Sequence, residues 1–343
     1  MLKKAISICL LFVITLSLAG CGSHYSKDYH IGLIYTTEYW NTTKICFLDD
    51  NMEEKQTLSY HYPNISYDGF CNSFIQNDKL FLLPKGNADK LDYGKVVALN
   101  LEDGKIDEYD FGRTNMTDFY FSDEDVYLCS NLNWISYLDQ YHDGNIETME
   151  IQNCLLDTIG VLDGRIFGFI SHLDDEKYSF CEFNISEQDY KVLFEMNMDG
   201  SPCFMEVYKD KLYFAYNNIL YEYDTINDSM SNITLPHNNA FNLTVVGDDL
   251  YIAYTDLFEE KKSYIEVMHL PEKEIVKSME YNGSILQLEV SKTNPDIIYL
   301  MDYENLMEYD ISGEVEKMVN KIHLQSSGDY FVGGFFLNKT ENN

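Results

Sequence analysis

Basic residues are scarce in this sequence. The 343-residue chain holds 24 lysine and arginine residues against 57 aspartate and glutamate residues, and its formal net charge is −33. Nucleic acids and anionic lipid headgroups are bound through clustered lysines and arginines, so the sequence predicts no nucleic-acid partner and no attraction to anionic lipid. We interpret the acidity as that of a solvated, soluble surface. Attraction of cations or of a basic partner is the alternative.

Motifs that carry chemistry are also missing. The sequence has no G-x-S-x-G elbow, no Walker sequence and no dinucleotide-binding glycine fingerprint. Its eight histidines form no H-x-H or H-E-x-x-H pattern, no cysteines have zinc-ligand spacing, and the acidic runs lack the ligand series of an EF-hand loop. We therefore predict no catalytic residue, no metal and no cofactor from the sequence.

A long apolar run occurs at the N-terminus. Residues 1–4 are basic, residues 5–18 are apolar, and residues 18–21 read Leu-Ala-Gly-Cys. This order is typical of a secretory signal, and the run is too short to span a bilayer permanently. An ordinary signal peptide, or a buried helix with a chance cysteine, is the alternative.

The Leu-Ala-Gly-Cys ending resembles the lipobox of bacterial lipoproteins. The resemblance implies that residues 1–20 are removed and that the thiol of Cys21 takes a diacylglyceryl group. It also implies that residues 21–29 carry the lipidated cysteine and a tether. Two acyl chains anchor a protein stably where one is marginal. We therefore expect a lipid-anchored protein on the extracytoplasmic face of the cell membrane.

Six cysteines follow Cys21. An even number in an exported protein permits disulfides, but no C-x-x-C pair occurs. Three of the six fall inside predicted strands, where a free thiol packs as a small apolar group. We expect mostly buried thiols and leave the pairing open for Cys46, Cys71, Cys129, Cys154, Cys181 and Cys203.

A strand pattern repeats about every forty residues over most of the chain. An acidic turn is followed each time by an aromatic-rich strand, and the aromatic positions are Phe81, Tyr127, Phe167, Tyr213, Tyr251 and Tyr299. This period, read as short strands, is that of the four-stranded blade of a β-propeller. We expect the six rings to occupy equivalent positions between blades.

The second half of each repeat is a hairpin with period-two alternation, and seven such hairpins can be found. The sequence therefore predicts an all-β fold, a β-propeller of seven blades of four antiparallel strands. Blade one lacks an innermost strand, and the C-terminal stretch 330–336 can supply it, which would close the ring and remove an open sheet edge. Six or eight blades, or a pair of β-sandwiches, are the alternatives.

The repeats resemble the broad class of YVTN-like and TolB-like propellers over residues 30–337. This likeness rests on periodicity, because the tryptophan-aspartate and kelch signatures are absent. We expect a single propeller domain over residues 30–337 and a frayed polar tail over residues 338–343.

The segments that vary most follow the aromatic strands or link one blade to the next. In a propeller these segments open on one face, and variable loops on a rigid scaffold are where binding usually resides. The only two tryptophans fall here, and exposed rings could stack on a sugar or anchor a protein. Ordinary packing over blade edges is the alternative. The candidate binding residues on this face are Trp40, Tyr93, Arg113, Trp134 and His237.

We expect a non-catalytic binding or scaffolding module for another envelope protein or an extracellular ligand. The rival is a propeller enzyme, a hydrolase or lyase acting on a saccharide or lactone in the axial channel, since propeller enzymes often lack local motifs. An enzyme should gather three or more ionisable residues with mutually perturbed pKa values around the channel mouth. A binding module should show aromatic and neutral polar groups on the rim.

Overall fold

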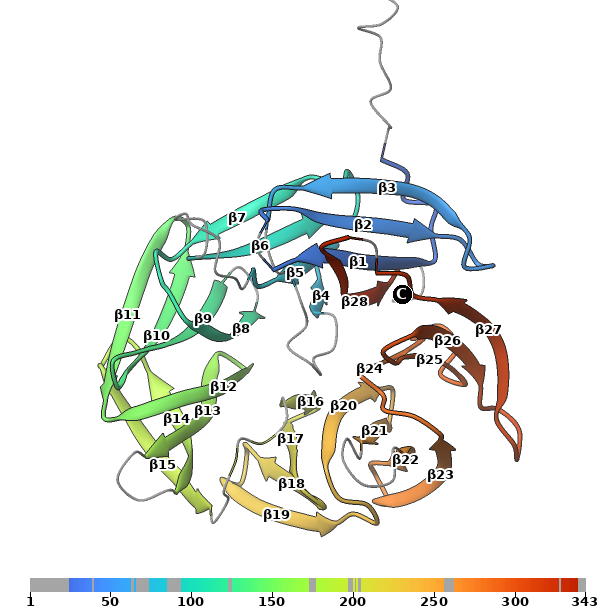
Figure 1. Ribbon diagram of the computed structural model, residues 1–343. Helices are drawn as coiled ribbons and strands as arrows, with labels where there is room; N and C mark the ends of the chain where they lie inside the picture. Colours follow the sequence, from blue (N-terminus) through green and yellow to red (C-terminus); the bar gives the residue numbers. More distant parts are fainter. Residues whose placement is uncertain are drawn as a thin grey trace, which may run out of the picture.

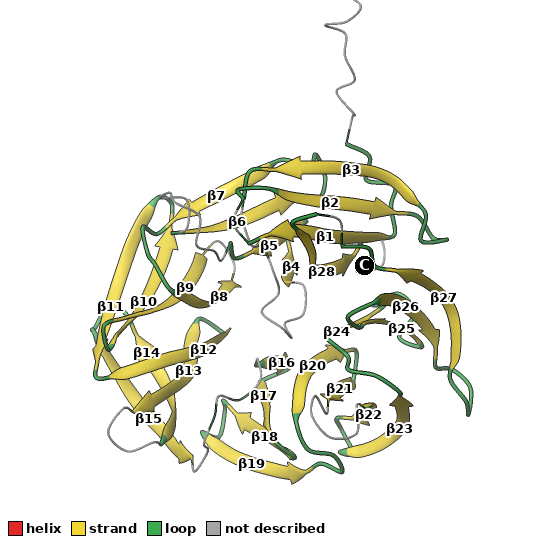
Figure 2. Cartoon of the chain, in the orientation of Figure 1, coloured by secondary structure: helices red, strands yellow, loops and turns green. Residues whose placement is uncertain are grey.

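The computed structural model forms a ring of seven four-stranded antiparallel sheets (Figure 1). It describes residues 25–38, 40–62, 65, 74–84, 94–122, 125–172, 177–196, 200, 202, 205–255, 262–326 and 328–338. All regular structure in these ranges is strand (Figure 2). Among these residues, no helix is long and apolar enough to cross a membrane. The seven-bladed β-propeller is confirmed, and the alternatives of other blade counts and of paired sandwiches are excluded.

Each blade runs from an innermost strand near the ring axis to an outermost strand at the rim (Figure 1). Blade 1 takes its innermost strand from the C-terminal end of the chain. Its strands are β28 (Tyr330–Leu337), β1 (Ile31–Thr37), β2 (Thr43–Leu48) and β3 (Glu54–Tyr60). Blade 2 contains β4 (Phe74–Gln76), β5 (Lys79–Leu82), β6 (Lys95–Asn100) and β7 (Ile106–Asp110). Blade 3 contains β8 (Met116–Ser122), β9 (Asp125–Leu132), β10 (Ile135–His142) and β11 (Asn145–Gln152).

The remaining blades follow in chain order. Blade 4 contains β12 (Cys154–Leu162), β13 (Arg165–His172), β14 (Tyr178–Asn184) and β15 (Asp189–Met196). Blade 5 contains β16 (Glu206–Tyr208), β17 (Lys211–Tyr216), β18 (Ile219–Asp224) and β19 (Ser229–Thr234). Blade 6 contains β20 (Ala240–Val246), β21 (Asp249–Thr255), β22 (Ser263–His269) and β23 (Glu274–Tyr281). Blade 7 contains β24 (Gln287–Val290), β25 (Ile297–Met301), β26 (Asn305–Asp310) and β27 (Lys317–His323).

The acidic turn of the repeat in blade 4 is a tight hairpin turn. Asp163 and Gly164 join β12 to β13 and have φ angles of 52° and 74°. Two successive positive φ angles are those of a type I′ turn, whose twist matches that of the strands. Asp-Gly fits because glycine adopts this conformation without steric cost and aspartate tolerates it.

The six repeat aromatics occupy equivalent places. Each is the third residue of the second strand of its blade, in blades 2 to 7, and each is at most 5% exposed. Each also belongs to a different hydrophobic cluster, between its own blade and the next one around the ring. The core therefore consists of clusters between neighbouring blades, and the repeat interpretation is confirmed.

The C-terminal strand closes the ring as expected. Strand β28 pairs antiparallel with β1 along its whole length, from Ile31 opposite Leu337 to Thr37 opposite Tyr330. Phe336 enters the cluster between blades 1 and 2, and its ring lies where a side chain at Gly32 would point. A β-carbon at that position would lie 2.0 Å from the ring. A ring donated by β28 therefore takes up the space at this position in blade 1.

The four cysteines within the described residues are free thiols. Cys129, Cys154 and Cys181 are buried and Cys46 is half-buried. Burial raises the pKa of the Cys181 thiol to about 12, which suppresses the reactive thiolate. Cys71 and Cys203 lie outside the described residues.

Truncation of a repeat aromatic is expected to be costly. The Phe167 ring packs between blades 4 and 5, with its centroid 5.9 Å from that of Phe180 and 5.6 Å from that of Tyr223. We expect Phe167→Ala to lower the free energy of unfolding by ~3–5 kcal/mol, measured by urea denaturation. The matched control is Tyr303→Ala, because Tyr303 is exposed. The control should change stability by no more than ~0.5 kcal/mol. Equal losses in both variants would contradict the assigned packing.

Candidate functional site

The strand order gives the propeller two distinct faces. Because neighbouring strands are antiparallel, the loops after each second strand and the links after each fourth strand emerge at one end. We call this end the loop face; it includes the loop between β1 and β2 and residues 111–115, 133–134, 235–239 and 302–304. The opposite end is the turn face; it includes residues 49–53, 101–105, 163–164, 185–188 and 225–228. Four of the five candidate binding residues lie on the loop face, and Tyr93 lies outside the described residues.

Trp40 projects from the loop between β1 and β2 and is 61% exposed. Its indole Nε1 donates a hydrogen bond of 3.0 Å to Asp329 Oδ2, just before β28. The backbone beneath it is fixed, because its carbonyl accepts hydrogen bonds from Thr37 Oγ1 and from the Thr42 amide. A mostly exposed ring therefore stands on a rigid base.

Trp134 is also 61% exposed and sits in the two-residue turn between β9 and β10. Asn133 and Trp134 have φ angles of 52° and 67°, as in a type I′ turn. The Trp134 carbonyl accepts a hydrogen bond of 2.9 Å from the amide of Asn153. Packing over blade edges thus covers the smaller part of both tryptophans.

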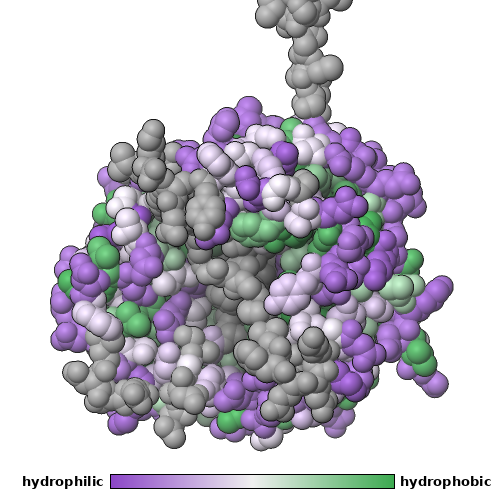
Figure 3. All heavy atoms as spheres, viewed as in Figure 1, coloured by the Kyte–Doolittle hydropathy of each residue, from purple (hydrophilic) through white to green (hydrophobic). Residues whose placement is uncertain are grey.

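Exposed aromatic side chains are segregated to the loop face. In the part of the chain that the structure describes, the exposed large aromatics are Trp40, Trp134, Tyr303 and Phe331. Tyr303 lies between β25 and β26, and Phe331 is near the start of β28, so all four lie at the loop-face end. Exposed apolar residues of the turn face, such as Ile226, are aliphatic. In the view of Figure 3, hydrophilic side chains dominate the rim of the ring.

Arg113 is engaged in a structural ion pair. Its Nε and Nη2 donate hydrogen bonds of 2.7 and 2.8 Å to the two carboxylate oxygens of Asp139, which is fully buried. The guanidinium also lies over the Tyr137 ring, 4.1 Å from its centroid. The hydrogen bonds to Asp139 raise the pKa of Arg113. The ion pair with Asp139 therefore fixes the link between blades 2 and 3 to blade 3.

His237 forms a cluster with three residues of blade 6. Its ring stacks on Tyr264 with centroids 3.8 Å apart, and its Nε2 lies 3.6 Å from Glu266 Oε1. Tyr254 donates a hydrogen bond of 3.0 Å to Glu266 Oε2. Burial raises the pKa of the Glu266 carboxyl. The sequence offered one signal for this cluster beyond His237, namely a single acid between Ile265 and Val267 in an apolar strand.

Replacement of Glu266 by glutamine should change the pH dependence of stability. A raised carboxyl pKa in the folded state means that the contribution of Glu266 to stability is fully present below the ordinary value of 4.5 and is lost as the pH rises through the folded pKa. We expect this loss to be absent in Glu266→Gln, so that the stability of the variant rises relative to that of the wild type as the pH increases above 4.5. Chemical denaturation at a series of pH values measures it. The control is Glu304→Gln, because Glu304 is exposed. A constant difference across pH would contradict the burial argument.

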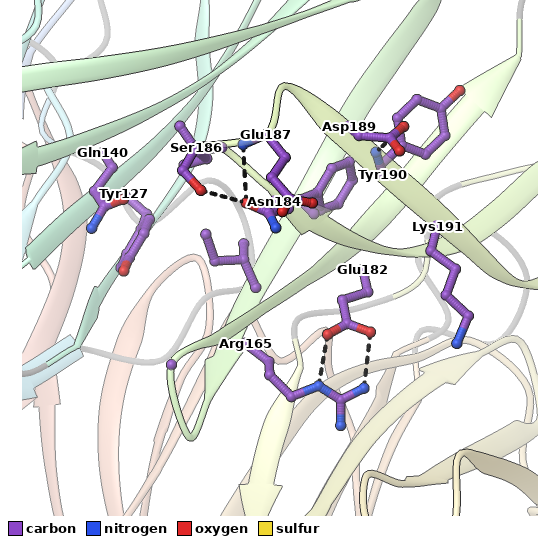
Figure 4. A pocket seen from close by; sticks show the side chains of 14 residues that line it. Tyr127, Gln140, Arg165, Glu182, Asn184, Ser186, Glu187, Asp189, Tyr190 and Lys191 are labelled. Atoms are coloured by element: carbon purple, nitrogen blue, oxygen red, sulfur yellow. Dashed lines mark hydrogen bonds and ion pairs between the residues drawn. The ribbon is translucent and has the colours of Figure 1, made fainter.

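A pocket of about 500 Å³ lies on the turn face, between blades 3 and 4 (Figure 4). Its size is in the range of small-molecule sites. The sequence had not predicted it. Its polar and charged lining includes Gln140, Arg165, Glu182, Asn184, Ser186, Glu187, Asp189 and Lys191.

The charged pair in this pocket is held in its ionised form. Arg165 donates hydrogen bonds of 2.7 and 2.9 Å to the two carboxylate oxygens of Glu182 (Figure 4). A third hydrogen bond, of 2.9 Å, runs to the carbonyl of Thr225. The pair lowers the pKa of Glu182 and raises that of Arg165. A general acid or base works best with a pKa near the working pH, so the shifted pKa values indicate a structural role for this pair. The hydrogen bond from Arg165 to Thr225 joins blade 4 to blade 5.

Carboxylates on the innermost strands also have hydrogen-bond partners. Asp118 Oδ2 accepts from Thr158 Oγ1 at 2.7 Å and from the Ile159 amide at 2.9 Å, which ties β8 to β12. Glu289 Oε1 accepts from Gln287 Nε2 at 2.9 Å. Across the described ranges, no group of three or more histidine, cysteine, aspartate or glutamate side chains is arranged to hold a metal ion.

The seven four-stranded sheets in a ring define a seven-bladed β-propeller. No protein-family model matches the sequence, and no curated protein matches it. The chain is similar to one in the crystal structure of the Mitotic Checkpoint Complex, with 10% identity, a TM-score of 0.58, and coverage of 78% of this chain and 81% of that one. It is similar to a functionally unknown protein from Desulfotomaculum acetoxidans DSM 771, with 14% identity, a TM-score of 0.56, and coverage of 86% and 99%.

A third similar structure is apo AztD from Citrobacter koseri. The identity is 11%, the TM-score is 0.53, and the match covers 90% of this chain and 98% of that chain. At identities this low, similarity extends to the fold alone.

Proposed function

We propose that this chain is a lipid-anchored extracytoplasmic propeller that binds another envelope protein or an extracellular ligand through its loop face, without catalysis. The observation that carries the proposal is that, among the residues the structure describes, the exposed aromatic side chains all lie on that face. Tryptophan and tyrosine supply large contact area with little loss of side-chain entropy, so they dominate binding surfaces. The fixed backbone under Trp40 and Trp134 further lowers the entropy lost on binding.

The enzymatic alternative receives less support. Among the described residues, the pocket pair Arg165 and Glu182 is held ionised, and the inner-strand carboxylates Asp118 and Glu289 accept hydrogen bonds from neighbouring groups. These arrangements stabilise the ring. The loop face carries the exposed aromatic groups that favour a binding module.

Cross-linking in the native membrane tests the binding role. We expect a specific partner to co-purify with the wild-type protein, and recovery to fall about tenfold or more in Trp40→Ala or Trp134→Ala, as for hot-spot residues that contribute ~2 kcal/mol. The matched control is Ile226→Ala, because Ile226 is an exposed apolar residue of the turn face. Equal recovery from all variants would contradict the role of the loop face. Turnover of a substrate in an unbiased screen, with no partner recovered, would favour the enzyme.

A further inference from the structure

We infer that the propeller is held with its turn face toward the membrane and its loop face away from it. This inference rests on the lipid anchor at Cys21 that is part of the proposed function. It follows from how residues 25–29, which we call the docked segment, pack against the ring.

The first residue of the docked segment is fixed at the turn face. The Tyr25 hydroxyl donates a hydrogen bond of 2.8 Å to the carbonyl of Leu101, which begins the turn between β6 and β7. Its ring covers Gly104 in the same turn, where a β-carbon would lie 2.8 Å from the ring. On its other side the ring packs edge-on against Phe47, with centroids 5.5 Å apart. Tyr25 is therefore clamped between blades 1 and 2.

Polar contacts fix the next residues to blade 1. The amide of Ser26 donates a hydrogen bond of 2.9 Å to Gln56 Oε1, and Lys55 Nζ lies 2.9 Å from Asp28 Oδ2. Both partners lie near the start of β3, next to the turn that joins it to β2. The docked segment therefore follows the turn-face edge of the first blade.

The end of the docked segment is buried in the ring closure. Tyr29 is 5% exposed, and its ring centroid lies 4.7 Å from that of Phe47 and 6.2 Å from that of Phe336. The side-chain amide of Asn338 donates to the carbonyls of Lys27 and Tyr29. The segment is thus joined to the end of the last strand as well as to blades 1 and 2.

The stretch of chain between Cys21 and the docked segment is too short to let the loop face lie against the membrane. Tyr25 follows Cys21 by four residues, which span at most ~14 Å at ~3.5 Å each. The seven residues of β1 alone extend ~23 Å at ~3.3 Å each, and the loop face lies beyond their far end. With the segment docked, an acylated Cys21 holds the turn face near the headgroups and keeps the loop face out of their reach.

The charge of the turn face agrees with an anchor made by lipid alone. Asp49, Asp50 and Asp103 lie in the turns beside the docked segment. The lysines of the same region, Lys27, Lys55 and Lys105, form ion pairs with Glu102, Asp28 and Asp103. Because carboxylates outnumber lysines there, this surface adds no net attraction to anionic headgroups. With the turn face toward the membrane, the partner of the proposed function reaches the loop face from the side away from the membrane.

The two native tryptophans can report this orientation, because both lie on the loop face. The lipidated full-length protein is reconstituted in phosphatidylcholine vesicles with a nitroxide-headgroup lipid, and tryptophan quenching is measured. We expect Trp40 and Trp134 to be unquenched by this lipid, although acrylamide quenches both from solution. A reporter at the other end of β2, Asn51→Trp in a Trp40→Phe, Trp134→Phe background, should be quenched several-fold more strongly.

Two outcomes would overturn the orientation. Stronger quenching of the native tryptophans would mean that the loop face lies on the membrane, and equal quenching would mean that the ring stands on its edge. Flotation of the protein with the vesicles is measured first. A protein that fails to float would refute the lipid anchor, and with it the orientation, which depends on that anchor. Flotation with equal or inverted quenching would refute the orientation alone.

Release of the docked segment provides the matched variant. Tyr25→Ala with Asn338→Ala removes the Tyr25 clamp and the two Asn338 hydrogen bonds but leaves Tyr29 packed on Phe47 and Phe336. The free span from Cys21 then grows from four residues to at most eight, or ~28 Å. We expect this variant to float as before and to retain its circular dichroism spectrum, while the difference in quenching between the two ends of β2 shrinks. An unchanged difference would show that the docked segment does not set the orientation.

Discussion

A chain that ends at Ser326, and so lacks β28, is expected not to form the ring. Strand β28 covers the inner edge of β1 along its whole length. Phe335 and Phe336 are fully buried and enter different clusters, the first between blades 7 and 1 and the second between blades 1 and 2. Loss of each ring costs ~3–5 kcal/mol. The two together reach the ~5–15 kcal/mol by which folded proteins are stable. The uncovered edge of β1 would also invite aggregation.

Circular dichroism, gel filtration and thermal unfolding measure this result. The control is a chain that ends at Asn338, which keeps β28 and its hydrogen bond from the Asn338 amide to the His30 carbonyl. The control should unfold cooperatively at the wild-type temperature. A second variant, Phe336→Ala, removes one ring and leaves the strand, and should lower stability without abolishing folding. A truncated chain that melts like the control would show that closure contributes little.

Cys21→Ala is expected to abolish retention at the membrane. Each buried methylene of an acyl chain contributes ~0.8 kcal/mol, so two chains anchor a protein stably and their loss releases it. We expect the variant to appear in the soluble fraction or to persist as an unprocessed precursor, with no incorporation of labelled fatty acid. Fractionation and metabolic labelling measure both.

Cys46→Ala is the matched control for this variant, because Cys46 is a half-buried thiol in β2. It should leave labelling and retention unchanged. A Cys21→Ala protein that is labelled and processed like the wild type would refute the assignment of the lipobox.

The sequence by itself determined the blades. Turns such as Asp163-Gly164 and the aromatic third residue of each second strand depend on chemistry within a few residues of chain, so their spacing was sufficient to predict them. The closing strand was predictable for a similar reason, since blade 1 lacked a strand and the C-terminal end of the chain had one to spare. Trp40 and Trp134 were placed on the correct face because the alternation of strand direction fixes the face of each loop.

Only the tertiary structure decided which contacts these residues make and which side chains are exposed. The fit of Phe336 over Gly32, the burial of Glu266 against His237, and the clamp on Tyr25 join residues that are distant in sequence. Such contacts depend on how one blade packs on the next, and the periodic pattern of the sequence does not predict that packing. The exposure of the tryptophan rings and the ionised pair of Arg165 and Glu182 likewise follow from which neighbours surround them. Local propensity and turn chemistry set the repeat, and the contacts between blades set which side chains are exposed.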